Sequence, residues 1–131
     1  MPQLVRAFPL RRPVEELEQF ARALAARRAE ADAFYGGFGV SRETWHIQQT
    51  PAGPWVIGVT EIANPTEAAP RYAGSTTDFD TWFKASIRHL TGVDPDSAPL
   101  GPPTTQVFEW SSFAAPTIQL GSVRAEPLLG A

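Results

Sequence analysis

Three charged or titratable side chains interrupt apolar, strand-like stretches of this chain: Arg6, His46 and Glu61. An imidazole with a near-neutral pKa serves as an acid or a base, and a buried arginine needs a carboxylate or a bound anion. We therefore take His46, Arg6 and Glu61 as candidate catalytic residues. Two structural alternatives stay open. His46 is then a half-exposed strand histidine bonded to a neighbour, and Arg6 forms an ion pair with Glu61 or Glu43.

Four tryptophans are many for a chain of 131 residues. They form either an aromatic pocket or the packing of a core and an interface. His89 follows Trp82 by two helical turns, where it either lines a pocket or is favoured by a helix C-terminus. The candidate ligand-binding residues are Trp45, Trp82, His89 and Trp110.

The sequence holds none of the usual metal or phosphate motifs. Its two histidines have no ligand spacing, there is no cysteine, and no phosphate loop, nucleophile elbow or HExxH occurs. We expect no cofactor and no metal. Because the net charge is −3, we expect no nucleic-acid partner.

No apolar run approaches the roughly 18 residues of a membrane span. Arg6, Arg11 and Arg12 also interrupt the N-terminal stretch before a signal-peptide core can form. We expect no membrane association and a cytoplasmic location.

The elements that must position these residues centre on the stretch 75–110. Thr77 is placed to cap a helix whose end Gly92 and Pro95 mark, and a short closing strand is expected at Val107–Trp110. The apolar face of that helix has helical spacing and consists of Phe79, Trp82, Phe83, Ile87 and Leu90.

The remaining pattern predicts three strands and one further helix. These are a strand at Leu4–Phe8, a helix from Pro13 to Phe34, and strands at Arg42–Gln49 and Trp55–Ile62. A short helical turn broken by Pro70 is expected at 64–72, and a strand at Thr117–Leu120.

The order β-α-β-β-α-β is that of the ferredoxin-like α+β fold, with a four-stranded antiparallel sheet and two helices on one face. We expect one domain at 1–110 and, at 111–131, an extension that packs on the domain or on its partner.

The strand at 55–62 is apolar on both faces. Trp55, Ile57 and Val59 lie on one face, and Val56, Gly58, Thr60 and Ile62 on the other. Two helices cover only one face of the sheet, so we expect a homodimer that buries the second face.

Several segments resemble the dimeric α+β barrel superfamily, and rhamnose mutarotases within it. They are Val59–Ile62, Ser75–Asp78 followed by Trp82-Phe83, Asp94–Pro99, and Gln106–Phe108. The resemblance implies a dimeric α+β barrel and a cofactor-free enzyme or binding protein for a small molecule. The first helix departs from the mutarotases, because it holds no histidine and no tyrosine before Tyr35. None of their catalytic residues is therefore carried over.

Two functions fit this pattern. One is a small-molecule-binding protein or cofactor-free enzyme with an apolar pocket between sheet and helices. The alternative is a non-catalytic dimeric structural or interaction module. An enclosed volume of roughly 300 Å³ or more, lined by the polar candidates, favours the first, and a solid core favours the second.

Overall fold

The computed structural model describes residues 3–96, 101, 104–120 and 123–127, with side chains described through Ile118. The elements are β1 Gln3–Pro9, α1 Val14–Ala26, α2 Arg28–Gly37, β2 Val40–Thr50, β3 Gly53–Ile62, α3 Pro65–Ala73, α4 Asp78–Thr91, β4 Phe108–Ser111, β5 Ala114–Leu120 and β6 Val123–Pro127.

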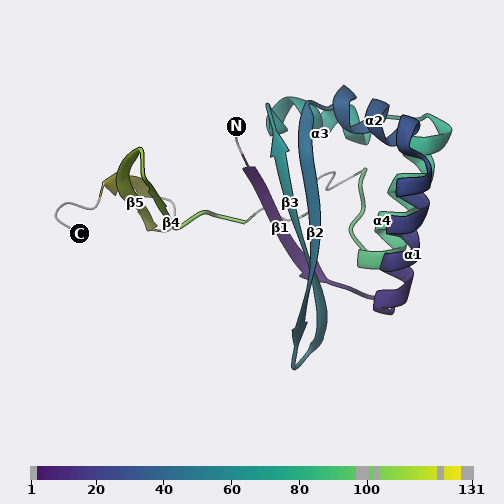
Figure 1. Ribbon diagram of the computed structural model, residues 1–131, viewed down its shortest axis with the longest axis horizontal. Helices are drawn as coiled ribbons and strands as arrows, with labels where there is room; N and C mark the ends of the chain where they lie inside the picture. The colour runs from purple at the N-terminus through teal and green to yellow at the C-terminus, as the bar shows by residue number, and fades with distance from the viewer. Residues whose placement is uncertain (1–2, 97–100, 102–103, 121–122, 128–131) are drawn as a thin grey trace.

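The strands form two antiparallel sheets rather than one. The main sheet has the order β1-β3-β2, and a second sheet, here called the arm, has the order β4-β5-β6. In Figure 1 the helices α1 and α4 lie on one side of the main sheet, and the arm stands off on the other side. The expected ferredoxin-like fold is therefore wrong, because the main sheet has three strands and the described chain has four helices.

The missing fourth strand has a local cause. The expected closing strand at 107–110 overlaps β4 from Phe108 on, and β4 pairs with β5 through the short turn at 112–113 instead of joining the main sheet. A hairpin closes a short loop, whereas pairing with β1 has to order a long connection. In the described part of this connection, Thr104 donates to the Val5 carbonyl at the β1 edge, from its N–H at 3.3 Å and also from its hydroxyl. Pro102 and Pro103 precede it in sequence and have no N–H to donate.

The expected helix at 13–34 is two helices. The break lies at Arg27, whose backbone (φ −103°, ψ 46°) leaves the helical region. The Arg27 side chain bonds Glu30 and lies over the rings of Phe79 and Trp82, at 4.9 and 4.6 Å from their centroids. The break therefore turns α2 across the end of α4.

The ends of α4 follow the sequence prediction. Thr77 Oγ1 accepts the Asp80 N–H at 3.1 Å, and Gly92 ends the helix at φ 75°. The region of the expected short turn holds α3, which Asn64 caps and which contains Pro70. The expected break at Pro70 is wrong, because Pro70 is the sixth residue of this nine-residue helix. It has no N–H to give the Thr66 carbonyl, and the helix ends three residues later at Ala73.

Main-sheet side chains alternate between two faces. The inner face, turned to the helices, holds Leu4, Arg6, Phe8, Glu43, Trp45, Ile47, Val56, Gly58 and Thr60; the outer face holds Val5, Ala7, Thr44, His46, Trp55, Ile57, Val59 and Glu61. The predicted alternation along β3 is confirmed, since Val56, Gly58, Thr60 and Ile62 are buried. No described element covers the outer face.

An aromatic cluster fills the space between the inner face and the helices. Phe34 of α2 is its centre, with ring contacts to Tyr72 at 5.9 Å and Phe83 at 4.6 Å. The buried core residues are Leu10, Leu17, Phe20, Ala31, Phe34, Val56, Tyr72, Phe79, Phe83 and Leu90. The core thus joins all four helices to the main sheet, and none of the arm residues whose side chains are described, 108–118, belongs to it.

Candidate functional site

A cavity of about 100 Å³ lies between the inner face of the main sheet and the helices. Its walls come from β1, β2, β3 and all four helices, and Val93 and Gly101 border it beyond α4. The aromatic lining consists of Phe8, Phe34, Tyr35, Phe38, Trp45, Tyr72 and Phe83. An apolar interior of this kind excludes water and strengthens any polar interaction made within it.

Four polar side chains meet on the sheet wall of the cavity. The register of the strands places Glu43 opposite Thr60, and Arg6 opposite Gly58. Arg6 Nη2 lies 3.0 Å from Thr60 Oγ1 and 3.5 Å from Glu43 Oε1. Thr60 Oγ1 donates to the same Glu43 oxygen at 3.0 Å, and Trp45 Nε1 does so at 3.3 Å. We call Arg6, Glu43 and Thr60 the polar triad.

Burial raises the pKa of Glu43 above its ordinary value of 4.5. The positive charge of Arg6 and the hydrogen bonds from Thr60 and Trp45 oppose this rise without cancelling it. A carboxyl group with a raised pKa in a largely buried site is suited to accept and return a proton near neutral pH.

Two phenols border the same space. Burial raises the pKa of Tyr35 and of Tyr72, and the nearby Glu43 charge raises both further. Arg6 partly offsets this effect at both residues. Both tyrosines are therefore neutral at physiological pH, and a neutral phenol keeps its O–H as a hydrogen-bond donor.

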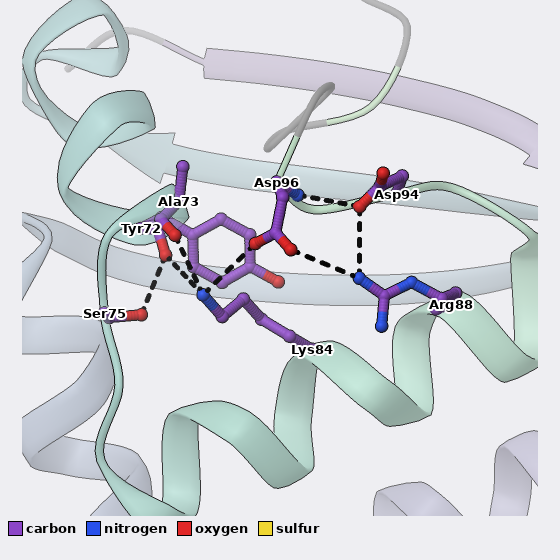
Figure 2. A network of polar contacts seen from close by, with 7 residues as sticks. All are labelled: Tyr72, Ala73, Ser75, Lys84, Arg88, Asp94 and Asp96. Carbon is purple, nitrogen blue, oxygen red and sulfur yellow. Dashed lines mark hydrogen bonds and ion pairs between the residues drawn. The ribbon is translucent and has the colours of Figure 1, made fainter.

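A network of charged side chains fixes the backbone at Tyr72 (Figure 2). Lys84 Nζ donates to the carbonyls of Tyr72 and Ala73 at 3.2 and 3.0 Å, at the end of α3. It also lies 3.7 Å from Asp96, whose other oxygen lies 3.6 Å from Arg88. The network ties α3 and the chain after α4 to α4, so that side of the cavity is fixed by charge as well as by packing.

A larger groove runs along the free edge of β2. It encloses about 730 Å³ between β2 and the helices α1 and α2. Tyr35, Glu43 and Trp45 line both the groove and the cavity. These side chains therefore border both spaces.

The three expected catalytic residues do not meet. Arg6 lies on the inner face, where Glu43 rather than Glu61 is its carboxylate partner. His46 and Glu61 lie on the outer face, and the exposed His46 ring bonds Thr44 Oγ1 at 3.1 Å. The main sheet therefore separates His46 and Glu61 from the cavity.

Of the expected ligand-binding residues, Trp45 lines the cavity. Trp82 packs on Phe20 outside it, and His89 is exposed, with its Nε2 3.5 Å from Glu16 Oε1. Trp110 belongs to the arm and is 66% exposed. Of the seven expected site residues, the structure thus brings Trp45 and Arg6 together and leaves the other five apart from them.

Sequence reasoning named Glu43 only as one of two partners for Arg6 in a structural ion pair, and it missed Thr60, Tyr35 and Tyr72. A signal existed for Glu43, because strand alternation puts it on the apolar face of Trp45 and Ile47. A charge on an apolar face indicates either a buried pair or a site. The tyrosines carried no such signal, since their helices are also rich in buried aromatic residues.

Comparisons of the chain with protein-family models, curated proteins and solved structures give no match. Among the described residues, no group of three or more His, Asp and Glu side chains is placed to hold a metal ion. In the same part of the chain, no helix is long and apolar enough to cross a membrane.

Proposed function

We propose that the protein binds a small, mostly apolar molecule in the inner cavity, as a binding protein or as an enzyme without a prosthetic group. The observation that carries this proposal is the polar triad on the wall of an aromatic cavity. A buried ion pair often stabilises a fold no better than apolar residues of the same volume. Its position beside open space therefore favours a role in recognition or catalysis.

The size and chemistry of the cavity limit the ligand. An apolar cavity of about 150 Å³ in another protein binds benzene, so about 100 Å³ suits one small ring or a short chain. Arg6, Tyr35 and Tyr72 offer N–H and O–H donors at its wall. The ligand class is thus a small neutral molecule with one carbonyl or hydroxyl oxygen.

The same geometry supports a proton transfer. With a carbonyl ligand, the Glu43 carboxylate takes a proton from the adjacent carbon. The electron pair of the broken C–H bond forms a C=C bond, and the π electron pair of the carbonyl group moves to its oxygen. Arg6 donates to that oxygen as negative charge develops on it. Return of the proton to carbon restores the Glu43 carboxylate and completes an isomerisation or exchange reaction.

The second candidate, a non-catalytic module, is favoured by one observation. Ligand pockets usually enclose about 300–1,000 Å³, and this cavity is smaller. In that case the polar triad is a structural ion pair beside a packing gap.

We also propose that the protein is a homodimer that buries the outer face. Val5, Ala7, Ile57 and Val59 lie side by side there, and two antiparallel rows of apolar side chains on an uncovered sheet favour burial against a partner. A second copy of this chain supplies a matching face, which a two-fold axis brings into register.

A matched pair of threonine substitutions tests the ligand site. Thr60→Val removes the hydroxyl of the triad, and Thr44→Val makes the same change on the outer face. With phenol as the probe, we expect Thr60→Val to change the dissociation constant about 2- to 10-fold, the effect of one hydrogen bond, and Thr44→Val to leave it unchanged. Binding is followed by amide chemical shifts of the cavity residues.

Equal effects of the two substitutions, or no phenol-dependent shifts in the wild type, would favour the structural module. Exchange of the α-protons of cyclopentanone in D2O separates an enzyme from a binding protein. An enzyme accelerates the exchange and loses this ability in Glu43→Gln, whereas a binding protein leaves the exchange at the buffer rate.

A further inference from the structure

The exposed large apolar side chains of the described chain gather in one short segment. They are Val107, Phe108, Trp110 and Phe113, with 58, 50, 66 and 95% of their surface exposed. Scattered exposed apolar residues are normal, but a contiguous group with two phenylalanines and a tryptophan marks an interaction surface.

Phe108, Trp110 and Phe113 of this segment belong to the arm, which no other described element of the chain covers. The arm strands pair extensively with one another, and none makes a comparable contact with the main sheet or a helix. Figure 1 shows the arm on the side of the main sheet that lacks helices, held away from it by an extended connection. The chain therefore carries two uncovered apolar surfaces, the arm and the outer face, which do not meet.

We propose that the arm of one chain docks on the outer face of a second copy, and that the second arm does the same in return. A two-fold axis makes such a contact reciprocal, so one arrangement covers both surfaces on both chains. Trp55, Ile57 and Val59 of β3 supply the central apolar row of the outer face. Trp110 and Phe113 supply large rings that bury much area for little loss of side-chain freedom.

The polar edge of the outer face fits the same arrangement. Thr44, His46 and Gln48 of β2 lie opposite Val59, Ile57 and Trp55. They give the apolar row a polar border along β2, as a solvent-accessible rim surrounds the core of an interface. This inference rests on the dimer proposed above and adds to it which segment reaches the partner.

Cross-linking tests the contact directly, because the natural chain has no cysteine. Phe113→Cys is mixed with a tagged Ile57→Cys chain and treated with bismaleimidoethane, and the products are read by mass. We expect the mixed dimer to exceed, several-fold, that formed by Phe113→Cys with Ala23→Cys, a cysteine on the exposed side of α1. Equal yields of the two mixed dimers would overturn the proposed contact between the arm and the outer face.

A chain with both Phe113→Cys and Ile57→Cys separates the two ways in which the arm can be covered. A cross-link within single chains, at a concentration where the mixed product fails to form, would show that the arm folds back on its own sheet and would overturn the proposal. Cross-links between two chains support the proposal.

Sedimentation equilibrium separates failure of the arm from failure of the dimer. Phe113→Asp and Trp110→Asp should each raise the dimer dissociation constant about tenfold or more, whereas Glu109→Ala should leave it nearly unchanged. A wild-type dimer that both aspartate variants leave intact overturns the arm contact alone. A monomeric wild type overturns the dimer and the arm contact together, while phenol binding in the cavity still reports on the ligand site.

Discussion

At the scale of single residues, Glu43 is the group whose environment matters most. Its side chain is 15% exposed, and one carboxyl oxygen contacts Arg6, Thr60 and Trp45. Burial nevertheless raises its pKa, so the free-energy cost of removing the carboxylate from water exceeds the stabilisation that these partners provide. The triad is therefore a weak source of stability, which is consistent with a role in the site.

This balance predicts a pH dependence with a defined sign. The unfolded chain releases the Glu43 proton near the ordinary pKa, and the folded protein releases it at higher pH. Between the two values the folded state holds more protons, so stability falls as pH rises. We expect the difference in unfolding free energy, wild type minus Glu43→Gln, to decrease from about pH 4 to pH 7.

Urea unfolding followed by circular dichroism measures this difference at each pH. The subtraction removes the contribution of the other carboxyl groups, which both proteins share. A difference that grows with pH would mean that the ion pair with Arg6 dominates and that the folded-state pKa of Glu43 is lowered.

At the scale of elements, α4 contributes the most to the core. Phe79, Phe83 and Leu90 are buried on one side of it, and Trp82 lies at the flank, half-buried beneath the Arg27 guanidinium. Trp82 thus lies at the edge, rather than at the centre, of the apolar face that the sequence predicts for this helix.

Two substitutions on α4 should differ accordingly. Phe83→Ala removes a ring that contacts Phe34, Tyr35 and Tyr72, and we expect it to cost about 3–5 kcal/mol of unfolding free energy. Trp82→Ala should cost less, since its ring is partly exposed. Thermal and chemical unfolding of both variants provide the measurement, and a larger loss for Trp82→Ala would mean that the helix is rotated from the position described.

At the scale of the whole molecule, the body and the arm are separate packing units. The buried core includes no arm residue whose side chain is described, so a chain that ends at Gln106 should fold with its main sheet and four helices. We expect its far-ultraviolet circular dichroism to show a cooperative melt at low protein concentration, close to that of the full chain.

At high concentration the full chain should melt higher than the shortened one, because association stabilises the folded state by mass action. A shortened chain that fails to fold would show that the arm supplies part of the core. Equal melting at all concentrations would show that the arm contributes nothing to association.

Local sequence determined much of the body of this protein. The strands of the main sheet, the Thr77 and Gly92 ends of α4 and the two apolar faces of β3 follow from side-chain period and backbone preference, which act over a few residues. The pairing of strands was decided only in the tertiary structure. Whether residues 107–110 join β1 or form a hairpin with β5 depends on loop entropy and on competing partners.

The candidate site, too, was decided partly by local sequence and partly by the tertiary structure. Strand alternation alone places His46 and Glu43 on opposite faces of β2, but it does not say which face the helices cover. Packing of α1, α2 and α4 on the Glu43 face made that face the wall of a cavity and left His46 exposed. The tertiary structure also brought Tyr35 and Tyr72, which lie on different helices, to the polar triad. Such a meeting arises from the packing of whole helices on a sheet, and no local pattern in the chain records it.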